Sequence, residues 1–291
     1  MPFVSREFEA QWEPLATKRV QGVDLRVMHH PSQVTGPVLL MTHGLEEFWQ
    51  AWLPMAEIMF DEFRILAVDA PWRAQNDYRW SEVATPSQWL AEVVDMLPAA
   101  PDVLVGHSFG SNTTLEYLAA PFAAPVGAAV LTAPVYRAKR EEISWDLLHS
   151  SLANFRDILS AGLSVRNGDR VIPPDVFEKM IDVLVDRVGP NGFINLFRLF
   201  GHSPFIPLEQ ITLPVLVIAG ETEQTDTGTG TQALAANLPR GRLAQLAEYN
   251  HFCEITQAGE CAALTRSFLL EHLPGYGPVG VPARPTAGGA G

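Results

Sequence analysis

The chain has 291 residues, 47% hydrophobic and 18% charged, which is long enough to bury a stable core without metal ions or disulfides. Its 20 Lys and Arg stand against 33 Asp and Glu, a net charge of −13, and this acidic balance disfavours nucleic acid and anionic membranes, which bind basic side chains. Two cysteines are too few for a disulfide framework, and we expect a cytoplasmic protein because charged residues occupy the place of a signal peptide and no apolar run could span a membrane.

The first predicted elements form an antiparallel β-hairpin at the edge of a sheet. Residues 17–20 and 23–28 favour strands, and Gln21 and Gly22 supply the turn between them. Short apolar runs then follow, each bounded by Gly, Pro or Asp, as is typical of strands buried on both faces of a parallel sheet. These runs are residues 38–41, 65–68, 103–105, 128–131 and 215–219.

Segments with helical character lie between these runs. Residues 52–59, 86–97 and 111–119 each follow one of the first three runs. This alternation of strand and helix predicts an α/β fold with a doubly wound, mostly parallel sheet.

The alternation stops after the run at 128–131. The 79 residues from Val135 to Leu213 far exceed the dozen or so that a crossover between parallel strands requires. Apolar spacing predicts a helix over 143–159, a second one from Pro174, and a third over 193–200. The insertion is therefore expected to be a helical cap, placed late in the sheet.

These elements divide the chain into three parts. The core is expected to comprise residues 1–134 and 213–274, ending in a helix over 258–272, and the cap residues 135–212. The glycine- and proline-rich residues 275–291 cannot bury much surface and predict a disordered tail.

The run at 103–105 leads into the pattern Gly-x-Ser-x-Gly, formed by Gly106, Ser108 and Gly110, and a helix is predicted directly after it. A serine on a sharp turn from strand to helix holds its hydroxyl clear of the sheet, and its neighbours two residues away must lack bulk. The pattern in this context predicts a nucleophilic serine.

Four segments together resemble the α/β-hydrolase family, in its capped, single-domain form. They are His43-Gly44 after the first core strand, the turn at 106–110, a loop at 220–223 that carries acidic residues, and His251 before the last helix. The resemblance covers residues 15–273, and the order serine, acid, histidine is the one that this fold uses. It implies a hydrolase that needs no cofactor and no metal.

The resemblance assigns roles to individual residues. Ser108 is a weak nucleophile on its own, so His251 is expected to take its proton and later pass it to the leaving group. The backbone N–H groups of Leu45 and Phe109 are expected to form the oxyanion hole, which binds the negative oxygen of the tetrahedral intermediate.

The acid of the triad has two candidates. The family places an aspartate three residues after the glycine that ends the late strand, and this chain has Glu223 there, with Asp226 three residues further on. Spacing from Gly220 onward keeps Glu223 in register, and glutamate is an accepted variant of this triad. We therefore predict Glu223, with Asp226 as the alternative.

Tryptophans are concentrated after the first two core strands, at the carboxyl edge of the sheet where ligands of α/β proteins bind. We expect Trp49 and Trp72 to line an aromatic substrate pocket. His107, within the Gly-x-Ser-x-Gly turn, is expected to be a packing residue.

The leading hypothesis is a serine hydrolase that cleaves an ester, thioester or lactone of an apolar or aromatic small molecule. Two alternatives keep the same triad, namely hydrolysis of a carbon–carbon bond and cofactor-free formation of peracids. A third alternative is a ligand-binding protein on the same scaffold, without catalysis. The sequence does not indicate an oligomeric state.

Overall fold

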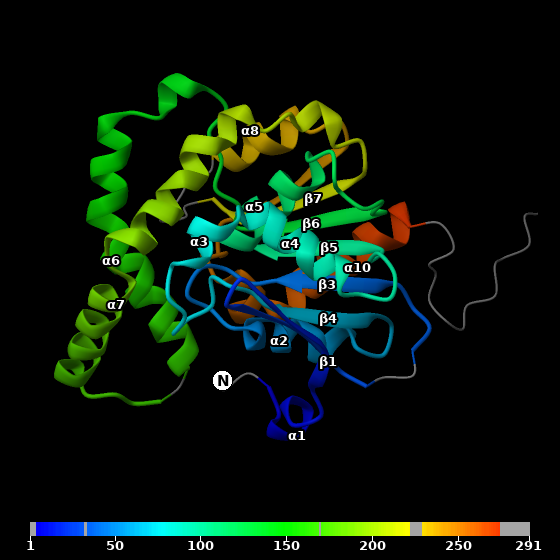
Figure 1. The fold of residues 1–291 in the computed structure, drawn as a ribbon, viewed down its shortest axis with the longest axis horizontal. Coiled ribbons are helices and arrows are strands. Elements are labelled where there is room, and N and C mark those ends of the chain that lie inside the picture. The colour runs from blue at the N-terminus through cyan, green and yellow to red at the C-terminus, as the bar shows by residue number, and fades with distance from the viewer. Residues whose placement is uncertain (1–3, 32–33, 169, 222–228, 274–291) are drawn as a thin grey trace, which may run out of the picture.

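The computed structural model describes residues 4–31, 34–168, 170–221 and 229–273. At its centre lies an eight-stranded sheet with the order β1-β2-β4-β3-β5-β6-β7-β8 (Figure 1). The strands are β1 (Glu13–Val20), β2 (Val23–His29), β3 (Val38–Thr42), β4 (Arg64–Asp69), β5 (Val103–His107), β6 (Ala128–Thr132), β7 (Val215–Gly220) and β8 (Gly241–Leu246).

The sheet is parallel from β4 to β8, and the antiparallel hairpin of β1 and β2 forms one edge. The central strand β3 has β4 on one side and β5 on the other. Thr42 at the end of β3 is in register with Gly106 of β5. Because parallel strands end at the same edge, the loops after β3 and β5 lie side by side, as the resemblance requires.

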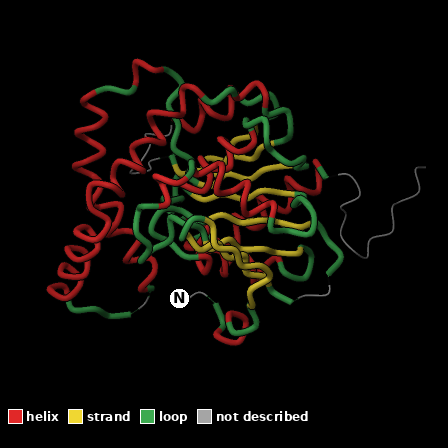
Figure 2. Tube along the Cα trace, in the orientation of Figure 1, coloured by secondary structure: helices red, strands yellow, loops and turns green. Residues whose placement is uncertain are grey.

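Helices cover both faces of the sheet (Figure 2). Side chains alternate along each strand, so Leu39 of β3 packs on one face with α2 (Leu53–Met59) and α10 (Ala258–His272), whereas Leu40 packs on the other. That second face is covered by α4 (Pro86–Asp95), α5 (Phe109–Leu118) and α8 (Thr229–Asn237). The predicted α/β architecture is confirmed.

Two long helices, α6 (Trp145–Asn167) and α7 (Pro174–His202), lie between β6 and β7 in the chain and stand at one end of the sheet, at left in Figure 1. They pack against each other through Phe155, Leu184 and neighbouring apolar residues. The third helix predicted in this insertion follows a break at Gly189, whose φ of 58° and ψ of −168° are not helical, with Pro190 directly after it. The label α7 therefore covers two helices, one on each side of this break, and the second continues to His202.

Strand β8 and helix α8 are not predicted by the sequence patterns. Strand β8 is the edge strand, only partly buried, and its sequence lacks the apolar run that marks the inner strands. Shorter elements complete the fold, namely the helices α1 (Arg6–Glu9), α3 (Trp80–Val83) and α9 (Cys253–Thr256), and the 3₁₀ turns Trp49–Trp52, Arg140–Glu142, Ser203–Phe205 and Leu208–Gln210.

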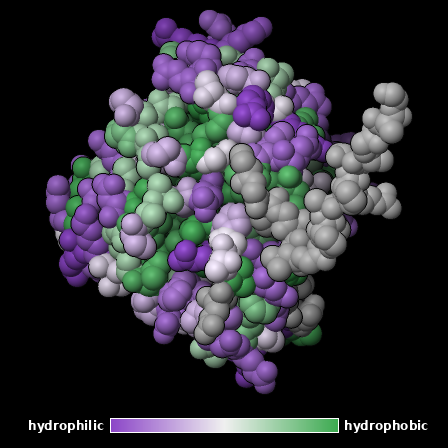
Figure 3. All heavy atoms as spheres, turned by 90° about the vertical axis from the view of Figure 1, so that its right-hand side faces the viewer, coloured by the Kyte–Doolittle hydropathy of each residue, from purple (hydrophilic) through white to green (hydrophobic). Residues whose placement is uncertain are grey.

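The surface turned away from α6 and α7 shows hydrophilic and hydrophobic residues interspersed (Figure 3). Within the described ranges, no helix combines the length and the apolar character needed to cross a bilayer.

Candidate active site

Ser108 occupies the turn from β5 into α5. Its φ of 49° and ψ of −113° lie in a region that residues other than glycine rarely adopt, and its side chain is buried next to a cavity. The backbone N–H of Ser108 donates to the carbonyl of Thr132 at 2.9 Å, which fixes the turn to the neighbouring strand. The structure therefore confirms the strained turn that the pattern predicts.

The two glycines of the pattern are required by contact with backbone atoms. A Cβ on Gly110 would lie 2.2 Å from the carbonyl oxygen of Thr42, and a Cβ on Gly106 would lie 2.6 Å from the carbonyl oxygen of Gly110. Both contacts are far shorter than van der Waals distance, so any side chain would push α5 away from the sheet.

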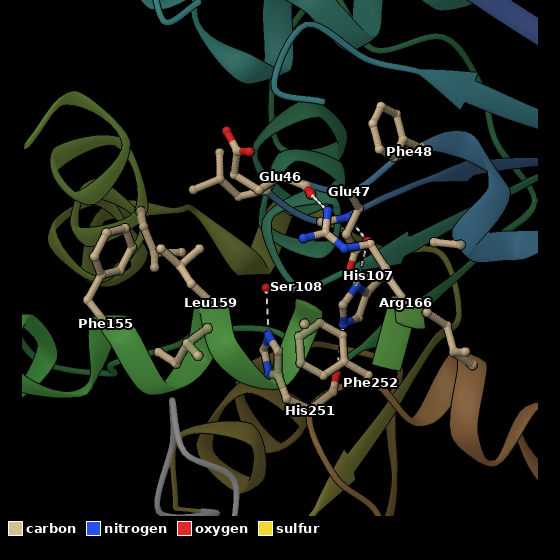
Figure 4. A pocket seen from close by; sticks show the side chains of 17 residues that line it. Glu46, Glu47, Phe48, His107, Ser108, Phe155, Leu159, Arg166, His251 and Phe252 are labelled. Atoms are coloured by element: carbon tan, nitrogen blue, oxygen red, sulfur yellow. Dashed lines mark hydrogen bonds and ion pairs between the residues drawn. The ribbon is translucent and has the colours of Figure 1, made fainter. Parts of the chain in front are cut away.

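His251 lies on the loop between β8 and α9, 143 residues after Ser108 in the chain. Its Nε2 atom is 2.9 Å from Oγ of Ser108, and both side chains are buried (Figure 4). This is the distance at which an imidazole can accept the proton of a serine hydroxyl. Two of the three predicted triad residues are thus in contact.

The predicted acid lies outside the described residues. Strand β7 ends at Gly220, and the description stops at Glu221 and resumes at Thr229. Both Glu223 and Asp226 fall in this gap, so the choice between them stays a prediction.

The predicted oxyanion-hole residues flank the nucleophile. Phe109 is the first residue of α5, where backbone N–H groups have no partner within the helix, and Leu45 lines the cavity that also contains Ser108. Among the described residues no group accepts a hydrogen bond from the N–H of Leu45 or Phe109, although the N–H groups of Gly44 and Glu46 are both engaged. Two donors thus remain for a substrate oxygen.

His107 is the centre of a buried cluster that the sequence did not reveal. Its Nδ1 lies 3.0 Å from a carboxylate oxygen of Glu47 and 3.3 Å from one of Glu254, and its Nε2 donates to the carbonyl of His251 at 2.7 Å. Glu47 also accepts from the N–H of Gly44 at 2.6 Å. The cluster therefore joins three loops, which carry the residues predicted as oxyanion hole, nucleophile and catalytic histidine.

The charges within this cluster depend on each other. Burial opposes a charge on His107, but the carboxylates of Glu254 and Glu47 and the hydrogen bonds raise its pKa to about 10. Burial likewise opposes a charge on Glu47, but the charge and hydrogen bond of His107 lower its pKa to about 2. His107 is therefore an imidazolium at neutral pH, which is more than the packing residue that was expected.

The same three side chains could be taken for a metal site, since their ligand atoms lie within 4.8 Å of one another. However, both ring nitrogens of His107 donate hydrogen bonds, and an imidazolium has no lone pair to offer a metal ion. We interpret Glu47, His107 and Glu254 as an ion-pair network. Its sequence signal is weak, because a glutamate beside a predicted catalytic loop is usually exposed.

Glu46, in the loop after β3, connects that loop to the two long helices α6 and α7. Its φ is 62°, and its carboxylate accepts hydrogen bonds from the hydroxyl of Tyr78 at 2.7 Å and from Arg187 of α7. Its carbonyl accepts from Nη1 of Arg166 in α6 at 2.5 Å. Helices α6 and α7 are therefore anchored one residue away from Leu45.

A largely apolar cavity opens above Ser108 (Figure 4). Helix α6 supplies one wall with residues spaced at intervals of three, four and seven, which places them on one face of the helix. These residues are Phe155, Ile158, Leu159, Gly162 and Arg166, and the remaining lining includes Phe48, Leu196, Phe252 and Ile255.

The expectation that Trp49 and Trp72 line this pocket is not supported. Neither belongs to the described lining, and both are buried in the packing behind it. Nε1 of Trp72 donates to the carbonyl of His43 at 2.9 Å, so this ring supports the loop after β3. The aromatic character of the cavity comes from phenylalanines, because the large indole rings fill the interior between loop and sheet.

Comparison with known proteins agrees with this geometry. Residues 38–264 match the model of the alpha/beta hydrolase family. A curated relative, (E)-2-((N-methylformamido)methylene)succinate hydrolase of Acinetobacter baylyi, is 21% identical over 247 residues, covering 83% of this chain and 94% of that protein.

Solved structures share the fold at lower identity. A membrane phospholipase A described as a bacterial virulence factor superposes with a TM-score of 0.66 at 17% identity, covering 89% of this chain and 86% of the other. The enol-lactonase of Burkholderia xenovorans gives 0.63 at 18% identity, covering 87% and 99%. At these identities the likeness concerns the fold alone.

Proposed function

Because the chain belongs to the alpha/beta hydrolase family, we propose that it is a serine hydrolase that cleaves an ester, thioester or lactone of an apolar or aromatic small molecule. The observation that carries the proposal is the 2.9 Å contact between Nε2 of His251 and Oγ of Ser108 beside an apolar cavity. Family membership supports hydrolysis, and this contact supports the serine mechanism.

The reaction follows from the geometry. Oγ of Ser108 forms a bond to the substrate carbonyl carbon while His251 takes the serine proton. The oxygen that becomes negative is held by the N–H groups of Leu45 and Phe109. Collapse breaks the bond to the leaving group, which receives the proton from His251. Water then attacks the acyl-enzyme, His251 takes its proton and returns it to Ser108, and the acid product leaves.

A fluorophosphonate probe tests the proposed function directly, because it reacts with serines that a neighbouring base activates. We expect the purified protein to be labelled at Ser108, as identified by mass spectrometry of the modified peptide. Labelling should be lost after heat denaturation, since activation requires His251 at hydrogen-bond distance. A folded protein that is not labelled at Ser108 would contradict the proposal and favour a binding protein on this scaffold.

The acid of the triad is tested by two isosteric changes. We expect Glu223→Gln to lower kcat by about 10²-fold or more, because His251 would lose the carboxylate that orients it and stabilises its charge. Asp226→Asn should change kcat by less than about 3-fold. Steady-state kinetics on p-nitrophenyl esters measure both, and the reverse ranking would transfer the role to Asp226.

A further inference from the structure

Arg166 brings a guanidinium into an otherwise largely apolar cavity. It lies on α6, one helical turn after Gly162 and on the face of α6 that lines the cavity above Ser108. In Figure 4 its side chain extends toward Glu46 and Glu47, beside the labelled ring of His107. A cation in this position is unexpected for a site that binds only neutral, apolar substrates.

Within the described part of the chain, Arg166 uses only part of its hydrogen-bonding capacity. Nη1 donates to the carbonyl of Glu46 at 2.5 Å, whereas Nε and Nη2 have no acceptor among the described residues. Nor does any described carboxylate form an ion pair with Arg166. The two nearby carboxylates are already engaged, that of Glu46 by Tyr78 and Arg187, and that of Glu47 by His107 and the N–H of Gly44.

The remaining donors of Arg166 suit one class of ligand. Burial lowers the pKa of Arg166, and the nearby carboxylates of Glu47 and Glu46 offset this only in part. An arginine stays protonated in proteins, so its charge persists in surroundings that solvate it poorly. Nε and Nη2 form the fork that binds a carboxylate through two parallel hydrogen bonds. A substrate carboxylate would therefore supply the partner that the described chain does not.

The position relative to the catalytic groups indicates which half of the substrate carries this charge. The leaving group must face His251, which hands it a proton. Arg166 instead donates a hydrogen bond to the carbonyl of Glu46. Glu46 directly follows Leu45, and the N–H of Leu45 is assigned to the carbonyl oxygen of the acyl group. The guanidinium therefore stands on the acyl side of the scissile bond.

We propose that Arg166 is the recognition site for a second carboxylate on the acyl part of the substrate, so that the enzyme hydrolyses monoesters or monothioesters of short dicarboxylic acids. This inference rests on the proposed serine hydrolase function and specifies its substrate class. The apolar side chains of α6 contact the methylene groups between the two carbonyl carbons.

The test compares two esters of the same shape. Mono(4-nitrophenyl) succinate carries a carboxylate where 4-nitrophenyl 4-methylpentanoate carries an isopropyl group. We expect the wild type to prefer the succinate ester in kcat/KM, and Arg166→Met to lower the ratio of succinate to methylpentanoate ester by about 100-fold. Arg166→Lys should retain part of the preference, because it keeps the charge but loses the fork.

Arg156→Met is the matched control. Arg156 lies on the same helix but is solvent-exposed and paired with Glu178 and Asp182, so its loss should leave the ratio unchanged. The ratio of the two kcat/KM values also corrects for a loosening of α6, because that would lower the hydrolysis rate of both esters equally. A wild type without preference for the succinate ester, or an equal loss of both activities in Arg166→Met, would overturn the proposal.

Failure of the proposed function gives a different result, namely no turnover of either ester together with no fluorophosphonate labelling of Ser108. If Ser108 is labelled but neither ester is turned over, the comparison uses the concentration of each ester that halves the labelling rate. Equal concentrations for the two esters would then contradict the role of Arg166, and a lower concentration for the succinate ester that disappears in Arg166→Met would support it.

Discussion

Replacing Ser108 by alanine is expected to lower kcat/KM for ester hydrolysis by about 10⁴-fold or more, because the only nucleophile in the proposed mechanism is lost. The residual rate would come from the N–H groups of Leu45 and Phe109, which still bind the oxyanion of a direct attack by water. Initial rates with p-nitrophenyl esters measure the effect. The melting temperature should change little, since the backbone hydrogen bond from residue 108 to Thr132 is kept and the Ser108 side chain, among the described residues, is hydrogen-bonded to His251 only.

Two comparisons make this prediction specific. Ser150→Ala, an exposed serine on α6, should leave the rate unchanged. His251→Ala should cost about as much as Ser108→Ala, and the double variant should be no slower than either single one, because the two side chains act as a unit across their 2.9 Å contact. Activity above about 1% in Ser108→Ala, or losses that multiply in the double variant, would contradict the mechanism.

Replacing Glu47 by glutamine is expected to lower the free energy of unfolding by roughly 3–5 kcal/mol, because it leaves the buried charge of His107 with one carboxylate fewer. Urea unfolding near pH 6 measures this loss. Glu92→Gln is the matched control, since Glu92 pairs with Lys18 at an exposed site and should change stability by less than about 1 kcal/mol.

The pH dependence of stability follows from the same pair. The pKa of His107 rises from 6.5 to about 10 on folding, so its contribution is complete below pH 6.5 and is lost as the pH rises toward 10. The pKa of Glu47 falls from 4.5 to about 2, so its contribution is complete above pH 4.5 and is lost as the pH falls toward 2. Stability from this cluster is therefore greatest between about pH 4.5 and 6.5.

Glu47→Gln should flatten the alkaline side of this profile. With one negative charge removed, the pKa of His107 is raised less on folding, and the fall in unfolding free energy between pH 6.5 and 10 becomes smaller than in the wild type. Unfolding curves at pH 6, 8 and 9.5 for both proteins provide the comparison. Parallel profiles would show that the two side chains do not share their charges as the structure indicates.

The cluster also explains why some functional residues could not be predicted. Ser108 is recognisable because two glycines in its immediate neighbourhood serve one local turn. Glu47 and His107 are 60 residues apart in the chain, and His107 and the carbonyl of His251 are 144 apart. Neither contact leaves a local pattern, so a glutamate three residues after Gly44 looks like any exposed acid until the fold buries it.

For the tryptophans, the sequence did show a pattern, but the pattern predicted the wrong cavity-lining residues. Their concentration after the early strands indicated the edge of the sheet where the cavity lies, but not which aromatic side chains line the cavity. Nε1 of Trp72 donates to the carbonyl of His43 and supports the loop after β3, whereas Phe155 of α6 and Phe252, directly after His251, line the cavity. Residue type predicts burial, and only the surrounding packing decides which side of a loop a ring occupies.

The sequence by itself determined the α/β architecture, the parallel inner strands and the helical character of the insertion, and it predicted the pairing of Ser108 with His251 that the structure shows as a contact. These depend on short-range rules, in which apolar runs, turn residues and the space around a glycine act over a few positions. The tertiary structure alone decided that His107 is charged, that Glu46 anchors α6 and α7 beside Leu45, and that Arg166 faces the cavity. Each of these properties arises from side chains that are distant in the chain and that only folding brings together in surroundings with little water.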